Sequence, residues 1–179
     1  MPSDDNTPLP PCDLLPEGDP RLYPLLGSSG QYALFACGCF LEGPDIAREE
    51  GIELSGPSEG EVIMRLVERA AHPAMGMATA IGRCWDWPLA MALFDVRRHV
   101  VWLTSSQEVP LFLTKLRTDN RWFWATDDWV LRDGLKYGLG SKASTIIEKP
   151  QSLEPESIIG ISWDDGSLIH PSGIHSGSL

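Results

Sequence analysis

The sequence predicts an α+β fold in which antiparallel β-sheets are flanked by helices. Between residues 81 and 126, short apolar runs alternate with short polar links, a pattern typical of consecutive antiparallel strands. Residues 58–70 carry apolar side chains at helical spacing, which indicates an amphipathic helix. Two apolar runs near the end of the chain enclose Asp164-Asp165-Gly166, and this turn sequence favours a β-hairpin.

The composition indicates one soluble, acidic domain. The chain has 179 residues, with 14 Lys+Arg against 25 Asp+Glu and a net charge of -11. A chain of this length can bury a core as one domain. The charge argues against nucleic acid or an anionic membrane surface as a partner, because phosphate binding needs clustered cations.

Other whole-chain features favour a cytoplasmic protein, or a virion protein if a phage encodes it. No apolar run approaches the roughly 18 residues of a transmembrane helix. The acidic start Met1–Asp5 is unlike a signal peptide. The 4 cysteines are too few for a disulfide scaffold in a chain of this length.

Residues 1–26 are predicted to be a proline-rich acidic arm, followed by an α+β domain over 27–170 and a loose tail over 171–179. Prolines before residue 25 fix φ and remove backbone donors, so a helix or central strand cannot persist there. The arm is either disordered or docked on a neighbouring subunit. Its candidate anchors are all apolar: Leu9, Leu14, Leu15, Leu22, Tyr23, Leu25 and Leu26.

The first elements of the domain follow from apolar runs. Residues 31–40 are short enough for a buried strand, although periodicity alone does not exclude a helix. Ser58 stands three residues before Glu61, the spacing of a capping box, and opens the amphipathic helix. We expect Pro73 to end that helix.

Strands are expected at 89–94, 100–104, 111–113 and 122–125, as one antiparallel meander. Thr126 is a plausible N-cap for a helix that would carry Trp129, Val130 and Leu135 and end near Gly138 or Gly140. The last hairpin would pair 158–163 with 167–169.

The tryptophans suggest a protein interface. Alternation along the strand places Trp122 and Trp124 on one face and Phe123 on the other. If one of these faces is core, an aromatic surface is left for a partner, since tryptophan is enriched at interfaces. We therefore expect Trp122 and Trp124 at an interface with a protein partner or a second copy.

The remaining polar candidates favour neither a metal nor a cofactor. Cys37 and Cys39 lack the spacing of a zinc site, and Asp164-Asp165-Gly166 lacks the further ligands of a calcium loop. The histidines are scattered, at positions 72, 99, 170 and 175. Asp86, between two tryptophans, could be a general acid or the cap of a turn.

Four segments, in order, resemble class II glutamine amidotransferase domains, which have an N-terminal nucleophile. They are PSEGEVIMRLVERA, PLAMALFDVRRHVVWLTSS, PLFLTKL with RWFWATDDWVLRDGL, and SLEPESIIGISWDDGSLI. They resemble, respectively, the family's S-D-T-E-V-I helix, its F-A-F-A-L-W-D hairpin, its P-L-Y-Y and F-A-S-E segments, and its closing D-G hairpin. The resemblance spans roughly residues 57–168 and implies a four-layer α-β-β-α sandwich, or part of one.

The family's chemistry matches less well than its fold. Its members hydrolyse glutamine with an N-terminal cysteine whose α-amine acts as base. Here Met1 and Pro2 stand first, so only cleavage before Cys12 would expose such a thiol. The family's oxyanion motif H-N-G matches Ser28-Ser29-Gly30, with Ser29 in place of the asparagine. Its glutamine-binding Gly-Asp pair matches Trp87-Pro88.

These departures predict a non-catalytic amidotransferase-like domain with no cofactor. We expect it to be a structural or protein-binding component of a larger assembly, such as a phage particle. Fewer than thirty residues precede Ser29, so one flank of the sandwich would be missing or supplied by a partner. Two alternatives stay open. One is an active amidotransferase or glutaminase that uses a processed Cys12, and the other is a small-molecule sensor on the same fold.

Overall fold

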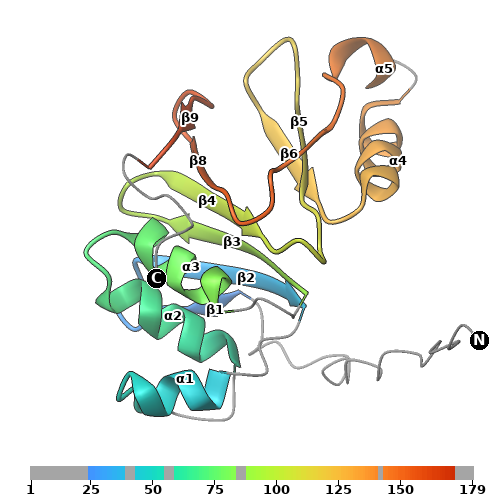
Figure 1. Ribbon diagram of the computed structural model, residues 1–179. Helices are drawn as coiled ribbons and strands as arrows, with labels where there is room; N and C mark the ends of the chain where they lie inside the picture. The colour runs from blue at the N-terminus through green and yellow to red at the C-terminus, as the bar shows by residue number, and fades with distance from the viewer. Residues whose placement is uncertain (1–23, 39–42, 55–58, 84–87, 141–142, 172–179) are drawn as a thin grey trace, which may run out of the picture.

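The computed structural model describes residues 24–38, 43–54, 59–83, 88–140 and 143–171, which form two antiparallel sheets with helices on their outer faces (Figure 1). The large sheet has the strand order β1-β2-β3-β4-β8-β9, and the small sheet has the order β6-β5-β7. The large sheet consists of β1 Leu25–Leu26, β2 Tyr32–Gly38, β3 Leu89–Asp95, β4 Val100–Ser105, β8 Ile158–Ser162 and β9 Leu168–Ile169. The small sheet consists of β5 Phe112–Lys115, β6 Trp122–Ala125 and β7 Gln151–Ser152. The helices are α1 Gly43–Glu49, α2 Glu59–Arg69, α3 Pro73–Gly82, α4 Asp128–Leu139 and α5 Ala143–Ile146.

The first core lies between the large sheet and helices α1, α2 and α3. Leu34, Leu93 and Trp102 are almost fully buried there, under the apolar face of α2. Gly160 on β8 makes room for Trp102, because a Cβ at that position would lie 2.8 Å from the indole ring. Burial of these large side chains supplies most of the stabilisation of this layer.

The second core lies between the two sheets. Val101 and Leu103 of β4 pack against Leu111, which directly precedes β5, and Leu113, which lies within β5. The outer face of the small sheet is covered by α4, whose Leu131 and Leu135 are buried. The layers therefore follow the order helices, large sheet, small sheet, helix, as Figure 1 shows.

Most predicted elements are confirmed. Residues 31–40 contain strand β2, the amphipathic helix is α2, which begins at Glu59, and the hairpin around Asp164–Gly166 is β8-β9. The α+β class with antiparallel sheets is also confirmed. Ser58 itself lies outside the described residues.

The single meander is wrong, because the predicted strands divide between two sheets. β3 pairs with β4, but the next neighbour of β4 is β8, while β5 and β6 pair in the small sheet. The segment after Ser105 crosses from one layer to the other, and both sheets gain an inner apolar face to bury. Local pattern does not distinguish a hairpin link from such a crossing.

Three boundaries also differ from the prediction. Pro73 does not merely end a helix but starts α3 at its first turn, where a proline loses no hydrogen bond, and His72 caps it. The N-cap of α4 is Asp127 in place of Thr126. Leu25 and Leu26, assigned to the arm, form strand β1 against Ala33 and Leu34.

The buried face of α4 also differs. Leu135 is buried as predicted, but Trp129 and Val130 are exposed, and Leu131 takes the inner position. None of the described helices is both long and apolar enough to cross a membrane.

Candidate functional site

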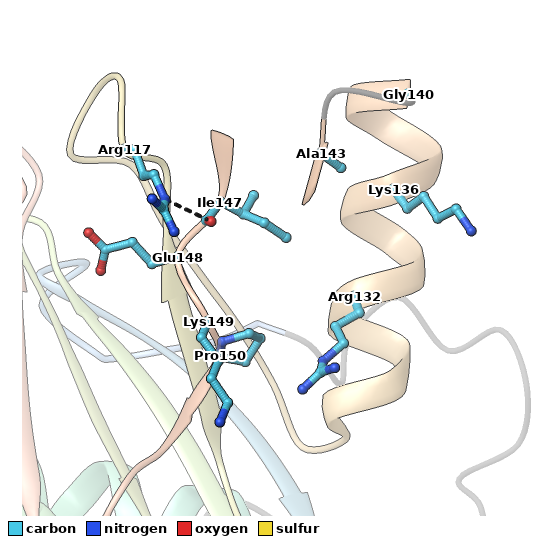
Figure 2. A pocket seen from close by; sticks show the side chains of 9 residues that line it. All are labelled: Arg117, Arg132, Lys136, Gly140, Ala143, Ile147, Glu148, Lys149 and Pro150. Atoms are coloured by element: carbon cyan, nitrogen blue, oxygen red, sulfur yellow. Dashed lines mark hydrogen bonds between the residues drawn. The ribbon is translucent and has the colours of Figure 1, made fainter. Parts of the chain in front are cut away.

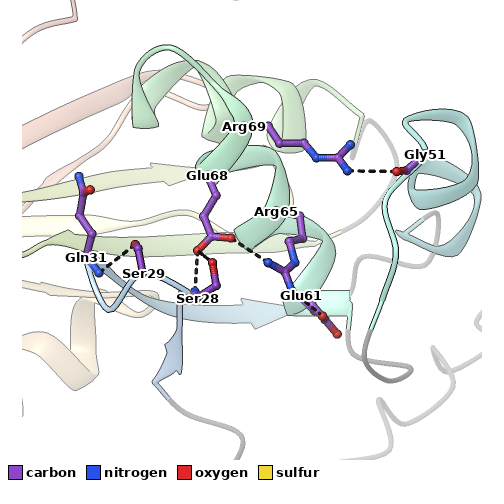
Figure 3. A network of polar contacts seen from close by, with 8 residues as sticks. All are labelled: Ser28, Ser29, Gln31, Gly51, Glu61, Arg65, Glu68 and Arg69. Carbon is purple, nitrogen blue, oxygen red and sulfur yellow. Dashed lines mark hydrogen bonds and ion pairs between the residues drawn. The ribbon is translucent and has the colours of Figure 1, made fainter.

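The turn Ser28–Gly30, matched to the oxyanion motif, joins β1 to β2 and is held by a carboxylate of α2 (Figure 3). The backbone amide and the hydroxyl of Ser28 both donate to Glu68 Oε1, at 2.6 and 2.8 Å. Arg65 donates to Glu68 Oε2 at 3.1 Å and also pairs with Glu61. Ser28 stands at the position of the motif's histidine, whereas the oxyanion donors of the motif come from its asparagine and glycine, matched here by Ser29 and Gly30. The Gly30 amide donates to the Gly27 carbonyl oxygen at 3.0 Å, so it is already bonded within the turn.

Pro88, the described member of the other matched pair, lies at the opposite end of the same strands. Pro88 precedes β3, and its carbonyl lies so close to Gly38, the last residue of β2, that a Cβ there would come within 1.9 Å. Tyr32, next to the Ser28–Gly30 turn, pairs instead with Asp95 at the far end of β3. Six strand steps separate these ends, about 20 Å. Ser29 and Gly30 therefore do not share one pocket with Pro88, and Trp87 lies outside the described residues.

The cysteines offer no nucleophilic centre among the residues that the structure describes. Cys37 is an exposed free thiol inside β2, so it has no α-amine of its own to act as base. Cys12, the fallback nucleophile, lies outside the described residues, as do Cys39, Cys84 and Asp86. No cluster of metal-ligating side chains occurs in the described part of the chain.

The predicted interface tryptophans point inward. Trp122 and Trp124 are half-buried and pack on the core between the sheets, and Trp122 Nε1 donates to the carbonyl oxygen of Gly166 at 2.8 Å. Phe123, on the opposite face of β6, lies on the side of α4. Both faces of β6 therefore serve internal packing, and a role for the two tryptophans at an interface stays a prediction. The arm anchors Leu9, Leu14, Leu15, Leu22 and Tyr23 lie outside the described residues.

A connected set of aromatic rings joins the two sheets, and we call it the aromatic patch: Phe35 of β2, Phe94 of β3, Trp124 of β6 and Trp163 directly after β8. Phe35 and Trp163 are exposed, whereas Phe94 and Trp124 are half-buried. The ring centroid of Phe94 is 5.4 Å from that of Phe35, 6.3 Å from Trp124 and 5.8 Å from Trp163. Phe35 is 42% exposed and Trp163 is 44% exposed. Rings in such contact act as one apolar surface. The small sheet ends here, because β6 is its edge strand.

An ion pair between buried Asp95 and half-exposed Arg98 holds the β3-β4 turn. Asp95 is fully buried, and its carboxylate accepts from Arg98 Nη1 at 2.8 Å and from the Arg98 backbone amide at 3.1 Å. The hydrogen bond to Asp95 is the main reason that the pKa of Arg98 is raised. In the same turn His99, at φ 55°, stacks on Trp163.

Of the other histidines, His72 caps α3 by accepting from the Ala74 amide through Nδ1 and contacts Trp102 edge-on. Its pKa is lowered, mainly by burial and then by Arg98. His170 is exposed near the end of the described chain, and His175 lies beyond it. The three described histidines, His72, His99 and His170, do not converge on one site.

A basic cleft occupies the opposite side of the small sheet, between α4 and the segment that leads into β7 (Figure 2). The cavity has a volume of about 500 Å³. Its lining residues are Arg117, Arg132, Lys136, Gly140, Ala143, Ile147, Glu148, Lys149 and Pro150. We call it the α4 cleft.

The solved structures give an independent test of the fold. The chain is similar to glutamine PRPP amidotransferase from B. subtilis, with a TM-score of 0.55 and 12% identity, over 78% of this chain and 29% of that one. It is similar to an allosteric regulatory enzyme of purine biosynthesis, with a TM-score of 0.60 and 14% identity, over 82% of this chain and 30% of that one. A class-II glutamine aminotransferase domain protein from Silicibacter pomeroyi gives a TM-score of 0.49 and 13% identity, over 78% of this chain and 67% of that one.

The chain has the fold of a class II glutamine amidotransferase domain. The resemblance that the sequence motifs indicated is therefore confirmed at the level of fold. The chain spans less than a third of the length of the first two enzymes. No protein-family model matches the sequence, and no curated protein matches it.

Sequence reasoning did not find the aromatic patch or the α4 cleft. Phe35 lies in the continuous apolar run of β2, and such a run is typical of a strand buried on both faces. Arg132 and Lys136 have helical spacing, which could have been noticed, but Arg117 and Lys149 come from distant segments. Only tertiary contacts place these cations around one cleft.

Proposed function

We propose that this chain is a non-catalytic domain of the amidotransferase fold that binds a protein through its aromatic patch, as one component of a larger assembly. The observation that carries the proposal is the pair of exposed rings, Phe35 and Trp163, which half-buried Phe94 connects into one set. Large aromatic side chains in contact with water are the residues that most often supply binding energy at protein interfaces.

The absence of catalysis is supported by the contacts of the matched residues. A class II enzyme needs oxyanion donors and an amino-acid clamp at one place. The Gly30 amide instead donates to the Gly27 carbonyl oxygen at 3.0 Å, and Pro88 is about six strand steps, roughly 20 Å, from the Ser28–Gly30 turn. A donor that is already bonded and a clamp position that lies far from it both argue against glutamine hydrolysis.

We propose the N-terminal arm of a second copy as the occupant of the patch. Residues 1–23 supply leucines between prolines, and prolines reduce the conformational entropy that a docked segment loses. The first described residue, Pro24, leads directly into β1 at the edge of the large sheet. A segment over Phe35 would also reach the free backbone groups at the edge of β6.

Light scattering tests the binding part of the proposal. The full chain should self-associate, and both removal of residues 1–23 and Phe35→Ser should lower its mass to that of a monomer. Tyr137→Ser is the matched control, because this side chain is 95% exposed on α4, away from the patch. A full chain that is monomeric at high concentration would contradict docking by a second copy.

A glutaminase assay tests the catalytic part. We expect no hydrolysis of glutamine by the full chain, and intact mass should show no cleavage before Cys12. Activity that disappears in Cys12→Ala would instead identify a processed enzyme. The two tests are independent, so the binding role and the lack of catalysis can fail separately.

A further inference from the structure

The α4 cleft gathers positive charge in a protein that has little of it. Four of the 14 Lys and Arg residues of the chain line this one cavity, although the net charge is -11. Glu148 is the acidic residue among the lining side chains, and its carboxylate turns away from the cavity to pair with Lys115 at 3.6 Å (Figure 2). Arg132 is paired with Asp128, whereas Arg117, Lys136 and Lys149 form no ion pair with a described carboxylate. Such unpaired like charges raise the energy of the folded state unless an anion compensates them.

Two of the cations are held in fixed orientations. Arg117 Nε donates to the Ile147 carbonyl oxygen at 3.2 Å, and Arg132 Nε donates to Asp128 at 2.8 Å. No described residue accepts a hydrogen bond from the terminal nitrogens of either guanidinium group, so these remain for another acceptor. A guanidinium anchored in this way loses less entropy when it binds a phosphate or carboxylate in a bidentate manner.

The cleft also has the size and lining of a ligand site. Its volume of about 500 Å³ is within the range of small-molecule pockets. Ala143, Ile147 and Pro150 form an apolar surface between the cations. Figure 2 shows that Arg132 extends from α4 toward the side that holds Lys149 and Pro150, while Lys136 stands at the rim with its ammonium group turned outward.

We propose that the α4 cleft binds a small organic anion with two or more negative groups, either phosphates or carboxylates. Arg117 and Arg132 would each take one group from opposite walls, Lys149 would add charge between them, and the apolar surface would contact the carbon part of the ligand. This site is separate from the aromatic patch, so the proposal goes beyond the protein-binding role and does not depend on it.

Titration calorimetry with pyrophosphate and with citrate tests the proposal and distinguishes phosphate from carboxylate ligands. The full chain should bind at least one of them with a Kd below about 1 mM in low salt. Binding should weaken as NaCl is added, because salt screens the cleft charges. Arg117→Gln and Lys149→Gln should each weaken binding, and the double variant should weaken it by about tenfold or more.

Arg97→Gln provides the matched control. Arg97 is exposed in the turn between β3 and β4, away from the cleft, and its removal changes the net charge of the protein as much as Lys149→Gln does. Circular dichroism should confirm that all variants are folded. Equal weakening by Arg97→Gln, or no binding of either anion, would overturn the proposal.

A synthetic peptide of residues 1–20 supplies the third arm of the experiment. The charged side chains of this peptide are all acidic, so the peptide itself could be the anion that binds in the cleft. Tight binding of this peptide that is lost in the Arg117→Gln, Lys149→Gln double variant, without binding of pyrophosphate or citrate, would reject the small anion. Binding of pyrophosphate or citrate that the peptide does not displace would support it.

Discussion

Ser28 gives both of its donors to one oxygen of Glu68: the backbone amide at 2.6 Å and the hydroxyl at 2.8 Å. The contact ties the first turn of the large sheet to helix α2, forty positions away in sequence. Ser28 is the first residue of the turn that the sequence matched to the oxyanion motif, so this contact anchors the turn to the helix layer of the protein.

Glu68→Ala should lower the free energy of unfolding by about 1–2 kcal/mol, because two hydrogen bonds to a charged acceptor are lost. Urea denaturation followed by circular dichroism measures this change. Glu53→Ala is the control, since Glu53 is exposed in the loop after α1. Equal stability of the two variants would show that the turn does not depend on Glu68.

Asp95→Ala should destabilise the protein by about 2 kcal/mol, because a buried network then loses the acceptor for Arg98 and its backbone amide. The loss should stay below that of a fully buried ion pair, since Arg98 is 44% exposed and can be hydrated. Asp164→Ala removes an exposed partner of His99 and should change stability by less than about 0.5 kcal/mol. Thermal or urea unfolding compares the two variants.

Stability should fall as the pH is lowered through the ordinary pKa of histidine, in part because of His72. Burial lowers the pKa of His72, so the unfolded chain binds a proton before the folded one does. The contribution of His72 is present above its unfolded pKa of about 6.5 and is lost progressively below it. Protonation also removes the Nδ1 lone pair that caps α3.

His72→Asn isolates this effect, because asparagine keeps an N-cap acceptor but does not titrate. The free energy of unfolding should depend less on pH in this variant than in the original chain between about pH 5 and 7. Urea unfolding at a series of pH values gives both slopes. Parallel slopes would show that His72 does not carry the dependence.

Gly38→Ala should be far more damaging than Gly30→Ala, although both glycines have positive φ. Gly38, at φ 116°, has Pro88 O within 1.9 Å of where a Cβ would lie, whereas nothing lies within 4 Å at Gly30, φ 68°. We expect about 1 kcal/mol for Gly30→Ala from the backbone alone. Gly38→Ala should cost more than about 3 kcal/mol or prevent folding, since the β2-β3 pair must separate. Similar unfolding midpoints for the two variants would contradict this.

The comparison of sequence and structure is instructive at the strand β6 and the helix after it. Alternation correctly placed Trp122 and Trp124 on one face and Phe123 on the other. It could not tell that α4 folds back over the outer face, or that Trp122 and Trp124 are half-buried against the core between the sheets. Likewise, Trp129 and Val130 are apolar but exposed, because the orientation of α4 is set by the surface that Leu131 and Leu135 bury.

The sequence by itself determined the elements that depend on neighbours along the chain. Helix α2 follows from apolar spacing, the β8-β9 turn from Asp164-Asp165-Gly166, and the amidotransferase fold from motifs in a fixed order. Only the tertiary structure decided which strands share a sheet, that Ser28 bonds to Glu68, and that Arg117 and Lys149 line the same cleft as Arg132. Those relationships depend on how segments far apart in the sequence pack against one another. The apolar face of one strand or helix could be buried in several ways, but only one arrangement buries the apolar faces of all the layers at once.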